Sequence, residues 1–313
     1  MKDMKVLITE PDDFSEKALS YLRSFCDISF LDGRIEDEIK NYDVLFIRLK
    51  FKFDYALLKK VTKLKYIVSP TTGLDHINQN FCKQHNIKIL SLKEETDFLE
   101  SVSATAELSF GLIISILRKI NEAANNVKLG SWQRDIFKGN DLKGKTLGIL
   151  GVGRVGKMVA KYGNCFGMQV IGYDINPDKK FKAIKYVSFD YLLKNSNIIS
   201  IHLPLNENTK NLISKDCFNK IKFGTYIINT SRGQIIDEKL LLKNLEKGYI
   251  KGAAIDVLSN EKQGLNTLTD NPLIKYAKNN SNLIITPHIG GASYDAMKLT
   301  EEFMAKKLLK NIK

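Results

Sequence analysis

A glycine-rich loop between a strand-like run and an amphipathic helix constrains this chain more than any other feature. Thr146–Leu150 is a short apolar run, and Gly151–Gly156 reads GVGRVG before apolar residues recur at helical spacing. A second strand-like run, Met168–Tyr173, ends at Asp174, 18 positions after the last glycine of the loop. This order of strand, glycine loop, helix, strand and acidic residue predicts a βαβ unit that binds a dinucleotide.

Each residue type in this pattern has a mechanical reason. Gly151 permits a tight turn, Gly153 lets the backbone approach a pyrophosphate, and Gly156 lets the helix pack closely on the strand. The helix N-terminus offers N–H groups to the phosphates, and Asp174 would accept hydrogen bonds from the adenosine ribose hydroxyls. That carboxylate would repel a 2′-phosphate, and no arginine follows it closely, which favours NAD over NADP. The alternative is a structural turn that binds no ligand.

The rest of the chain alternates strand-like and helix-like runs, which predicts an α/β protein with parallel sheets. The segment Ser101–Val127 is strongly apolar over residues 103–120, and we expect a helix buried between domains or subunits. The remaining expected strands are residues 4–8, 44–47, 66–69, 88–90, 198–202, 225–229, 252–257 and 283–286, and the other helices expected are 16–25, 55–61 and 293–309.

Length and composition fit a globular protein of two domains. The chain has 313 residues, of which 43% are hydrophobic and 27% charged. We expect no membrane span, because we find no apolar run of the roughly 20 residues that a span requires. The four cysteines are scattered without a CxxC pair, which argues against a zinc site or a disulfide framework. We accordingly expect no metal. The N-terminus has no apolar signal region, so we expect a cytoplasmic protein.

The formal net charge of +13 has three interpretations. It could reflect a solvated lysine-rich surface, an attraction for anionic substrates and cofactors, or a nucleic-acid partner. The lysines are spread along the chain and form no block, so nucleic-acid binding is the least favoured of the three.

Three polar residues follow predicted strands in the second half of the chain. Arg232, Glu261 and His288 come after the strands that end near residues 229, 257 and 286. The carboxyl ends of parallel strands line the ligand crevice, so all three side chains could face a bound nicotinamide. Singly, each could equally be a solvated or structural residue.

These residue types suit the reduction of a 2-keto acid. Arginine offers a planar, permanently charged fork for the substrate carboxylate and the developing oxyanion. Histidine supplies a proton donor near neutral pH, and a carboxylate beside it would orient the ring and favour its charged form. We therefore expect hydride transfer between the nicotinamide and C2 of a small 2-hydroxy or 2-keto acid, with His288 moving the hydroxyl proton.

Four motifs together resemble the D-isomer-specific 2-hydroxyacid dehydrogenases, a family that includes phosphoglycerate dehydrogenases, hydroxypyruvate and glyoxylate reductases and D-lactate dehydrogenases. Leu142–Gly156 (LKGKTLGILGVGRVG) resembles the family's cofactor signature. Ile228–Glu238 (INTSRGQIIDE), Gly252–Glu261 (GAAIDVLSNE) and Thr286–Ser293 (TPHIGGAS) resemble the segments that carry its catalytic arginine, glutamate and histidine. The motifs occur in the family's order and the likeness covers nearly the whole chain.

The resemblance implies further site residues. Those expected around the cofactor are Thr105, Gly151, Gly153, Arg154, Val155, Gly156, Asp174, His202, Pro204, Thr209, Thr230, Ser231, Asp256, His288 and Gly290, with Asp256 expected to hold the carboxamide. Those expected around the substrate are Arg48, Thr72, Gly73, Leu74 and Arg232.

The resemblance also implies a fold: a Rossmann-type doubly wound parallel sheet inserted into a second, flavodoxin-like α/β substrate domain. We expect the substrate domain to comprise residues 1–103 and 291–313, and the NAD-binding domain residues 104–290. The family is typically a homodimer, and the apolar helix near Leu108–Ile120 is the expected interface. The chain ends soon after its closing helix, so no C-terminal regulatory domain is expected.

Departures from the family pattern and rival functions leave questions open. Lys262 replaces the proline that commonly follows the glutamate, and 27 positions separate Glu261 from His288, which puts the loop and the substrate choice in doubt. A non-catalytic NAD-sensing corepressor is the main alternative function. A formate dehydrogenase typically pairs the histidine with glutamine, so Glu261 argues against it. The direction of the reaction and the choice among 3-phosphoglycerate, glycerate or hydroxypyruvate, glyoxylate and sugar-derived acids stay open.

Overall fold

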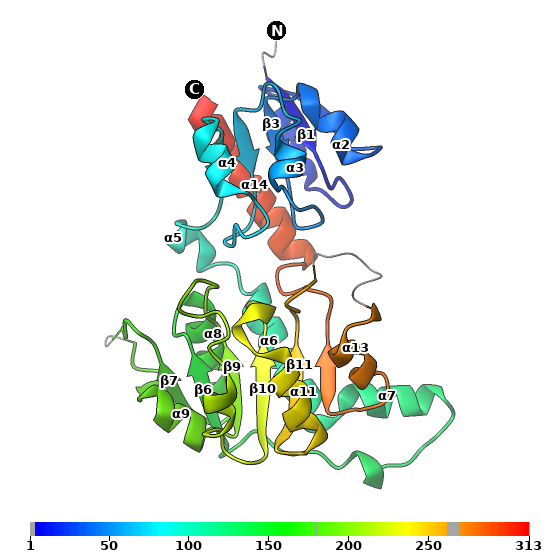
Figure 1. The fold of residues 1–313 in the computed structure, drawn as a ribbon, viewed down its shortest axis with the longest axis vertical. Helices are drawn as coiled ribbons and strands as arrows, with labels where there is room; N and C mark the ends of the chain where they lie inside the picture. Colours follow the sequence, from blue (N-terminus) through cyan, green and yellow to red (C-terminus); the bar gives the residue numbers. More distant parts are fainter. Residues whose placement is uncertain (1–3, 179–180, 262–268, 313) are drawn as a thin grey trace. The chain divides into compact units, whose positions relative to one another are not determined.

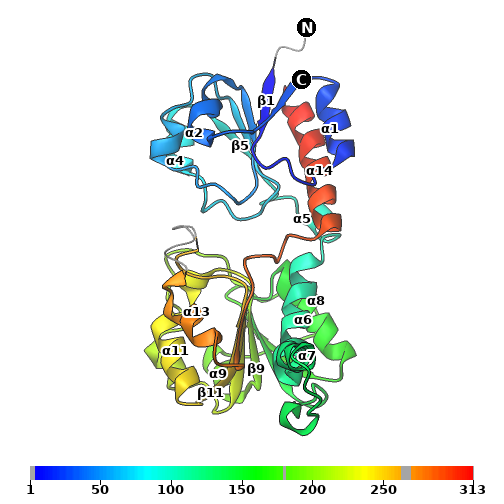
Figure 2. The ribbon, with the colours of Figure 1, turned by 90° about the vertical axis from the view of Figure 1, so that its right-hand side faces the viewer.

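The chain folds into two compact units, each built around a parallel sheet (Figures 1 and 2). The computed structural model describes residues 4–178, 181–261 and 269–312. The N-terminal unit comprises residues 1–102 and 292–313, and the central unit comprises residues 103–291. The chain leaves and re-enters the N-terminal unit close to residues 103 and 290, where the sequence predicts the two crossings.

The central unit contains a seven-stranded sheet in which all recorded strand pairs are parallel. Its order is β12-β11-β10-β9-β6-β7-β8, so the strand order reverses between β6 and β9. This is the doubly wound dinucleotide-binding order with one further strand, which confirms the predicted fold class. The strands are β6 (Thr146–Leu150), β7 (Gln169–Tyr173), β8 (Lys185–Tyr186), β9 (Ile198–Ile201), β10 (Thr225–Asn229), β11 (Ile250–Ile255) and β12 (Leu283–Ile285).

Helices cover both faces of this sheet because alternate strand residues point to opposite sides. In β10, Ile227 packs in the core beneath α9, α10, α11 and α13, whereas Ile228 packs in the core beneath α6 and α8. Figure 2 shows the two helical layers on either side of the sheet. The helices are α6 (Ala104–Arg118), α7 (Ile120–Lys128), η2 (Asp135–Phe137), α8 (Arg154–Cys165), α9 (Phe189–Asn195), α10 (Lys215–Phe218), η3 (Gly233–Ile235), α11 (Glu238–Glu246) and α13 (Pro272–Ala277).

The N-terminal unit has a five-stranded parallel sheet of order β2-β1-β3-β4-β5, which is the flavodoxin-like order that the resemblance implies. Its strands are β1 (Lys5–Ile8), β2 (Asp27–Phe30), β3 (Val44–Phe46), β4 (Tyr66–Val68) and β5 (Lys88–Leu90). Helices α1 and α14 pack on one face, and α2, η1, α3 and α4 pack on the other. The helices are α1 (Glu16–Arg23), α2 (Ile35–Glu38), η1 (Ile39–Asn41), α3 (Tyr55–Leu58), α4 (Gln79–Gln84), α5 (Thr96–Leu99) and α14 (Tyr294–Ile312).

The single helix predicted for residues 101–127 is wrong in detail. Lys119 adopts a left-handed conformation, with φ 53°, and this residue separates α6 from α7. The apolar side chains of α6 lie mainly within the central unit's own core, including Phe110, Ile113 and Leu117. Helix α6 therefore exposes little apolar surface, although the sequence predicts the dimer interface there.

One apolar stretch corrects the expectation that no segment could cross a membrane by length. Thr96–Arg118 has 23 residues and a mean hydropathy of 1.3, enough to pass such a test on length and composition. The core helix of a soluble protein passes the same test, and α6 supplies most of this stretch. Because α6 contacts α8, β10, β11 and β12, its apolar character is explained by the core of the central unit.

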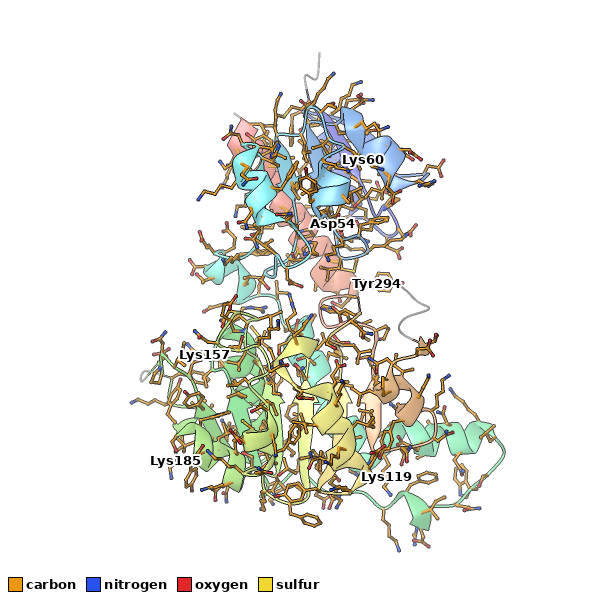
Figure 3. The ribbon with its side chains drawn as sticks, in the orientation of Figure 1. Asp54, Lys60, Lys119, Lys157, Lys185 and Tyr294 are labelled. Atoms are coloured by element: carbon orange, nitrogen blue, oxygen red, sulfur yellow. The ribbon has the colours of Figure 1, made fainter. Side chains whose placement is uncertain are left out.

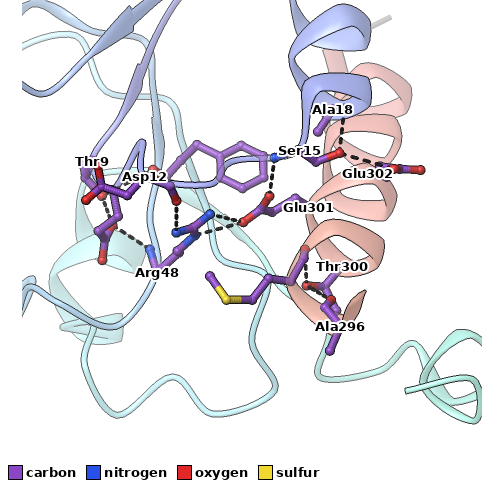
Figure 4. Close-up of polar contacts among 12 residues, drawn as sticks. Thr9, Asp12, Ser15, Ala18, Arg48, Ala296, Thr300, Glu301 and Glu302 are labelled. Carbon is purple, nitrogen blue, oxygen red and sulfur yellow. Dashed lines mark hydrogen bonds and ion pairs between the residues drawn. The ribbon is translucent and has the colours of Figure 1, made fainter. Parts of the chain in front are cut away.

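An ion pair fastens α14 to the sheet of the N-terminal unit (Figure 4). The Glu301 carboxylate accepts hydrogen bonds from Arg48 Nε at 2.9 Å and from the backbone N–H of Ser15 at 2.8 Å. Arg48 also donates to the carbonyl oxygen of Asp12. Burial raises the pKa of Glu301, while the Ser15 N–H and the Arg48 charge oppose that rise. The pair therefore joins three segments that are far apart in the sequence.

We expect Glu301→Gln to lower the free energy of unfolding of the N-terminal unit by about 3 kcal/mol, because Arg48 would keep its charge without a counter-ion. Hydrogen exchange of the α1 amides, monitored by mass spectrometry, measures this loss. Glu302→Gln is the matched control, since Glu302 pairs at 3.2 Å with the mostly exposed Lys17 and should cost below about 1 kcal/mol. Equal losses in the two variants would contradict the role given to Glu301.

Candidate active site

The glycine loop follows β6 at the point where the strand order reverses. Gly151 has φ +92°, and a Cβ there would lie 2.7 Å from the carbonyl oxygen of His202, which follows the neighbouring strand β9. A Cβ on Gly156 would lie 2.1 Å from the carbonyl oxygen of Gly151. Gly153 is the N-cap of α8, and no side-chain hydrogen bond from a described residue caps that helix end. The loop therefore leaves space and N–H donors for a pyrophosphate.

Asp174 directly follows β7 and faces the glycine loop. Its Oδ2 accepts a hydrogen bond from the Val152 N–H at 2.8 Å, and its Oδ1 accepts one from the Asn176 N–H at 2.9 Å. These bonds fix the carboxylate beside the loop, and each oxygen has further lone pairs for ribose hydroxyls. Arg154 and Val155 begin α8, and burial lowers the pKa of the Arg154 guanidinium. The position of the Asp174 carboxylate and the start of α8 at Arg154 fit the predicted dinucleotide site.

The segment after β9 lies at the same edge of the sheet and carries His202, Pro204 and Thr209. The His202 ring lies 2.8 Å from Ser200 Oγ, measured from Nε2, and burial lowers the pKa of this histidine to about 3. His202 is therefore neutral at physiological pH. Thr209 Oγ1 donates to the Pro204 carbonyl at 2.6 Å and accepts from the Asn206 N–H, which closes the turn after β9.

The Arg232 loop is shaped by the buried side chain of Asn229. Asn229 Oδ1 accepts from the Ser231 N–H at 3.0 Å, and its Nδ2 donates to the Arg232 carbonyl at 2.9 Å. A Cβ on Gly233 would lie 2.1 Å from the carbonyl carbon of Leu258. Only glycine allows this approach, which brings the Arg232 loop against the loop that ends at Glu261.

Asp256 holds the loop that carries His288. Its Oδ1 accepts from Thr286 Oγ1 at 2.6 Å and from the Ile289 N–H at 2.9 Å, and its Oδ2 accepts from the Gly290 N–H at 2.8 Å. Burial raises the pKa of Asp256, against the effect of these hydrogen bonds. His288 has φ +56°, a conformation that costs a non-glycine residue of order 1–3 kcal/mol. The Asp256 bonds stabilise the loop in this strained form.

His288 and Glu261 form a direct pair. His288 Nδ1 lies 2.8 Å from Glu261 Oε1, and their side chains are 25% and 19% exposed. Glu261 Oε2 also accepts from the Leu258 N–H at 3.2 Å. The carboxylate thus orients the imidazole through Nδ1 and leaves Nε2 for another group. The residues after Glu261, whose departure from the family pattern the sequence marks, lie outside the described residues.

A pocket of about 610 Å³ opens on one side of this pair. Its floor is apolar and comes from β12 and α13, and its polar groups include Glu122, Lys278, Asp256 and the Glu261–His288 pair. Among the described residues, no group of three or more histidine, cysteine, aspartate or glutamate side chains is placed to hold a metal ion.

The remaining predicted cofactor residues lie at the end of α6 that faces β10. Thr230 and Ser109 share a hydrogen bond between their hydroxyl oxygens at 2.6 Å, and Ser109 also donates to the Thr105 carbonyl. A Cβ on Gly290 would lie 3.1 Å from Asp256 Oδ2 and 3.3 Å from the Thr105 methyl carbon. Thr105, Thr230 and Gly290 are therefore close to one another, although the sequence places them far apart.

Apart from Arg232, the predicted substrate residues lie in the N-terminal unit. Thr71 Oγ1 donates to the Gly73 carbonyl at 2.9 Å and shares a 2.8 Å hydrogen bond with Ser69 Oγ, which shapes the loop of Thr72, Gly73 and Leu74. The guanidinium of Arg48, which is also predicted to bind the substrate, forms an ion pair with Glu301.

Comparison with known proteins decides the family. Residues 110–290, more than half of the chain, match the model of the D-isomer specific 2-hydroxyacid dehydrogenase, NAD binding domain. The chain belongs to the D-isomer-specific 2-hydroxyacid dehydrogenases. The resemblance drawn from the motifs is thereby confirmed, as is NAD as the cofactor of this domain family.

The relatives of this chain carry names of enzymes with different substrates. The chain is 32% identical over 315 residues to a D-3-phosphoglycerate dehydrogenase of Methanocaldococcus jannaschii, covering 98% of this chain but only 57% of that protein. It is 33% identical over 274 residues to a hydroxypyruvate reductase of Thermotoga maritima, covering 88% and 86%. The solved D-lactate dehydrogenase of Aquifex aeolicus, complexed with NAD and lactic acid, has 27% identity and a TM-score of 0.82, covering 98% and 95%.

Three residues that shape this site are not among those that the sequence predicts for it. Asn229, Ser109 and Thr286 each hold a loop or helix end that carries a predicted residue. The available signal was a polar residue inside an apolar run: Asn229 ends a buried strand, and Ser109 interrupts an apolar helix.

Proposed function

We propose that this chain is an NAD-dependent D-2-hydroxyacid dehydrogenase that reversibly transfers a hydride between NAD(H) and C2 of a small 2-hydroxy or 2-keto acid. The observation that carries the proposal is the 2.8 Å contact between His288 Nδ1 and Glu261 Oε1 on the sheet edge that also bears the glycine loop. The residues at that edge fit a dinucleotide, because Gly151 and Gly156 leave no room for a side chain and Asp174 stands beside the loop.

Each residue has a distinct role in the proposed reaction. When bound, NADH supplies the hydride, with its two electrons, that adds to the carbonyl carbon of the keto acid. His288 gives its Nε2 proton to the carbonyl oxygen, so the alcohol forms without a free alkoxide. Glu261 stabilises the protonated imidazole before that transfer. Arg232 binds the carboxylate and the carbonyl oxygen, where negative charge develops. The reverse direction uses the same groups, with His288 accepting the hydroxyl proton.

In this proposal the two units bind different ligands. Residues 104–290 would bind NAD, and residues 1–103 with 291–313 would bind the substrate through the loop of Thr72, Gly73 and Leu74. Arg48 would act as a structural residue that holds the neighbouring backbone, because its charge is balanced by Glu301.

We further propose a cytoplasmic homodimer formed through the central unit. The supporting observation is a run of exposed apolar side chains on α7 and the segment after it, namely Ile120, Val127, Leu129, Trp132 and Ile136. These are 47%, 50%, 85%, 87% and 54% exposed, in that order, which is unusual for apolar groups so close in sequence. This surface replaces α6 as the proposed interface.

The test follows the absorbance of NADH, and separately of NADPH, with glyoxylate, hydroxypyruvate, pyruvate, 2-ketoglutarate and 3-phosphohydroxypyruvate. We expect at least one of these acids to oxidise NADH much faster than NADPH, and the fastest identifies the substrate type. NADH binding without turnover on the panel would favour the NAD-sensing corepressor alternative. Failure to bind NADH at all would contradict the proposed function.

A further inference from the structure

Besides Asp174, the region around the glycine loop contains a pair of oppositely charged residues. Lys157 lies in the first turn of α8, directly after Gly156, and Figure 3 labels its side chain. Its Nζ forms an ion pair with Asp178 Oδ2 at 2.7 Å, and the side chains of Lys157 and Asp178 are 33% and 42% exposed. The ammonium also lies 5.4 Å from the centre of the Phe181 ring. The pair thus joins the start of α8 to the segment that follows Asp174.

Tyr186 shows that these charges gather in one place. Tyr186 lies in β8, where it pairs with Gly172 of β7. Burial raises the pKa of its hydroxyl, the charges of Asp178 and Asp174 add to that rise, and the Lys157 ammonium opposes it. Among the described residues, two carboxylates and one ammonium therefore act on this one hydroxyl.

We propose that Asp178 and Lys157 are a second determinant of cofactor choice, in which Asp178 neutralises an ammonium that would otherwise bind the 2′-phosphate of NADP(H). The inference rests on the proposed binding of NAD at the glycine loop. Asp174 repels that phosphate directly, and Asp178 removes the cation that could compensate. A salt bridge this exposed contributes little to the stability of the fold, so stability alone gives little reason for the pair.

The proposal makes the two aspartates interdependent. With Asp174→Asn alone, Lys157 stays paired with Asp178, and the affinity for NADPH should rise only a few-fold. With Asp174→Asn and Asp178→Asn together, the Lys157 ammonium loses its partner and both of these carboxylates are neutralised. A charge-assisted hydrogen bond to phosphate should then raise NADPH affinity by about tenfold or more beyond the single variant. NADH affinity should change much less, since NADH carries no 2′-phosphate.

The experiment measures binding of NADH and NADPH by fluorescence titration, so that turnover is not needed. It compares wild type, D174N, D174N/D178N, and the double variant with either K157M or K161M. Lys161 is an exposed residue one turn further along α8, which makes it the control for a general effect of charge. We expect K157M to abolish the gained NADPH affinity and K161M to retain it. Raising the salt concentration should weaken the gained NADPH binding more than NADH binding.

Two results would overturn this inference while leaving the proposed function intact. The first is a double variant that binds NADPH no better than D174N. The second is a gain that survives K157M, which would show that the ammonium is not the phosphate ligand. Failure of the wild-type protein to bind NADH is a different result, because it would remove the proposed function and this inference with it.

Discussion

Replacing His288 with alanine is expected to lower kcat by about 10²–10⁴-fold while leaving the affinity for NADH nearly unchanged. The imidazole is held through Nδ1 by Glu261 at 2.8 Å, so its Nε2 is the atom placed to exchange a proton with the substrate. The alanine variant lacks that proton donor, but it keeps the glycine loop and Asp174. Steady-state kinetics on the best keto acid, together with an NADH titration, separates the two effects.

Two further variants sharpen this test. Glu261→Gln can still accept a hydrogen bond from Nδ1 but no longer stabilises the protonated ring, so its loss of kcat should be smaller than that of His288→Ala. His85→Ala is the matched control, because His85 stacks on Phe81 in the N-terminal unit and is expected to take no part in the reaction. Near-normal turnover of His288→Ala would show that another group donates the proton.

The sequence predicted the sheet-based part of this molecule well. Residues such as Thr146–Leu150 and Thr225–Asn229 lie in fully buried parallel strands, and such strands leave continuous apolar runs in the sequence. Edge strands carry less of this signal. In the edge strand Asp27–Phe30 the two end residues are exposed and the two middle residues are half-buried, and the sequence pattern does not predict this strand.

The break in the long helix had no clear sequence signal. Lys119 takes a left-handed conformation in which an L residue is disfavoured, and the sequence offers neither glycine nor proline at that point. Local propensity therefore predicts a continuous helix. The packing of α6 in the core and the exposed position of α7 override this local preference. This is an effect of tertiary structure, which the periodicity of a single segment does not predict.

The residues of the candidate site also differ in how far the sequence predicts them. Residues with a local pattern, such as Gly151 and Asp174, could be located from spacing alone. The pairing of Glu261 with His288 joins positions on two different loops. The ends of the predicted strands allowed this pairing, and the resemblance to a family supported it. The ion pair of Arg48 with Glu301 joins positions near opposite ends of the chain, and no local pattern in the sequence indicates it.

The second large effect is expected at Arg232. Arg232→Ala should lower kcat/KM by about 10²–10³-fold, with a higher KM and a lower kcat, because one guanidinium is proposed to bind the substrate carboxylate and the developing oxyanion. The loop that presents it is fixed independently of its side chain, by Asn229 and by the close approach of Gly233 to Leu258. The variant should therefore fold and bind NADH normally.

Arg232→Lys distinguishes charge from geometry at this position. Lysine keeps the positive charge but lacks the planar fork that binds two oxygens at once, so it should recover part of the loss in KM and little of the loss in kcat. Arg34→Ala is the control, since Arg34 is 79% exposed in the N-terminal unit. If Arg232→Ala raised neither KM nor the barrier to turnover, the substrate would have to be held by another cation, and the proposed arrangement of the site would be wrong.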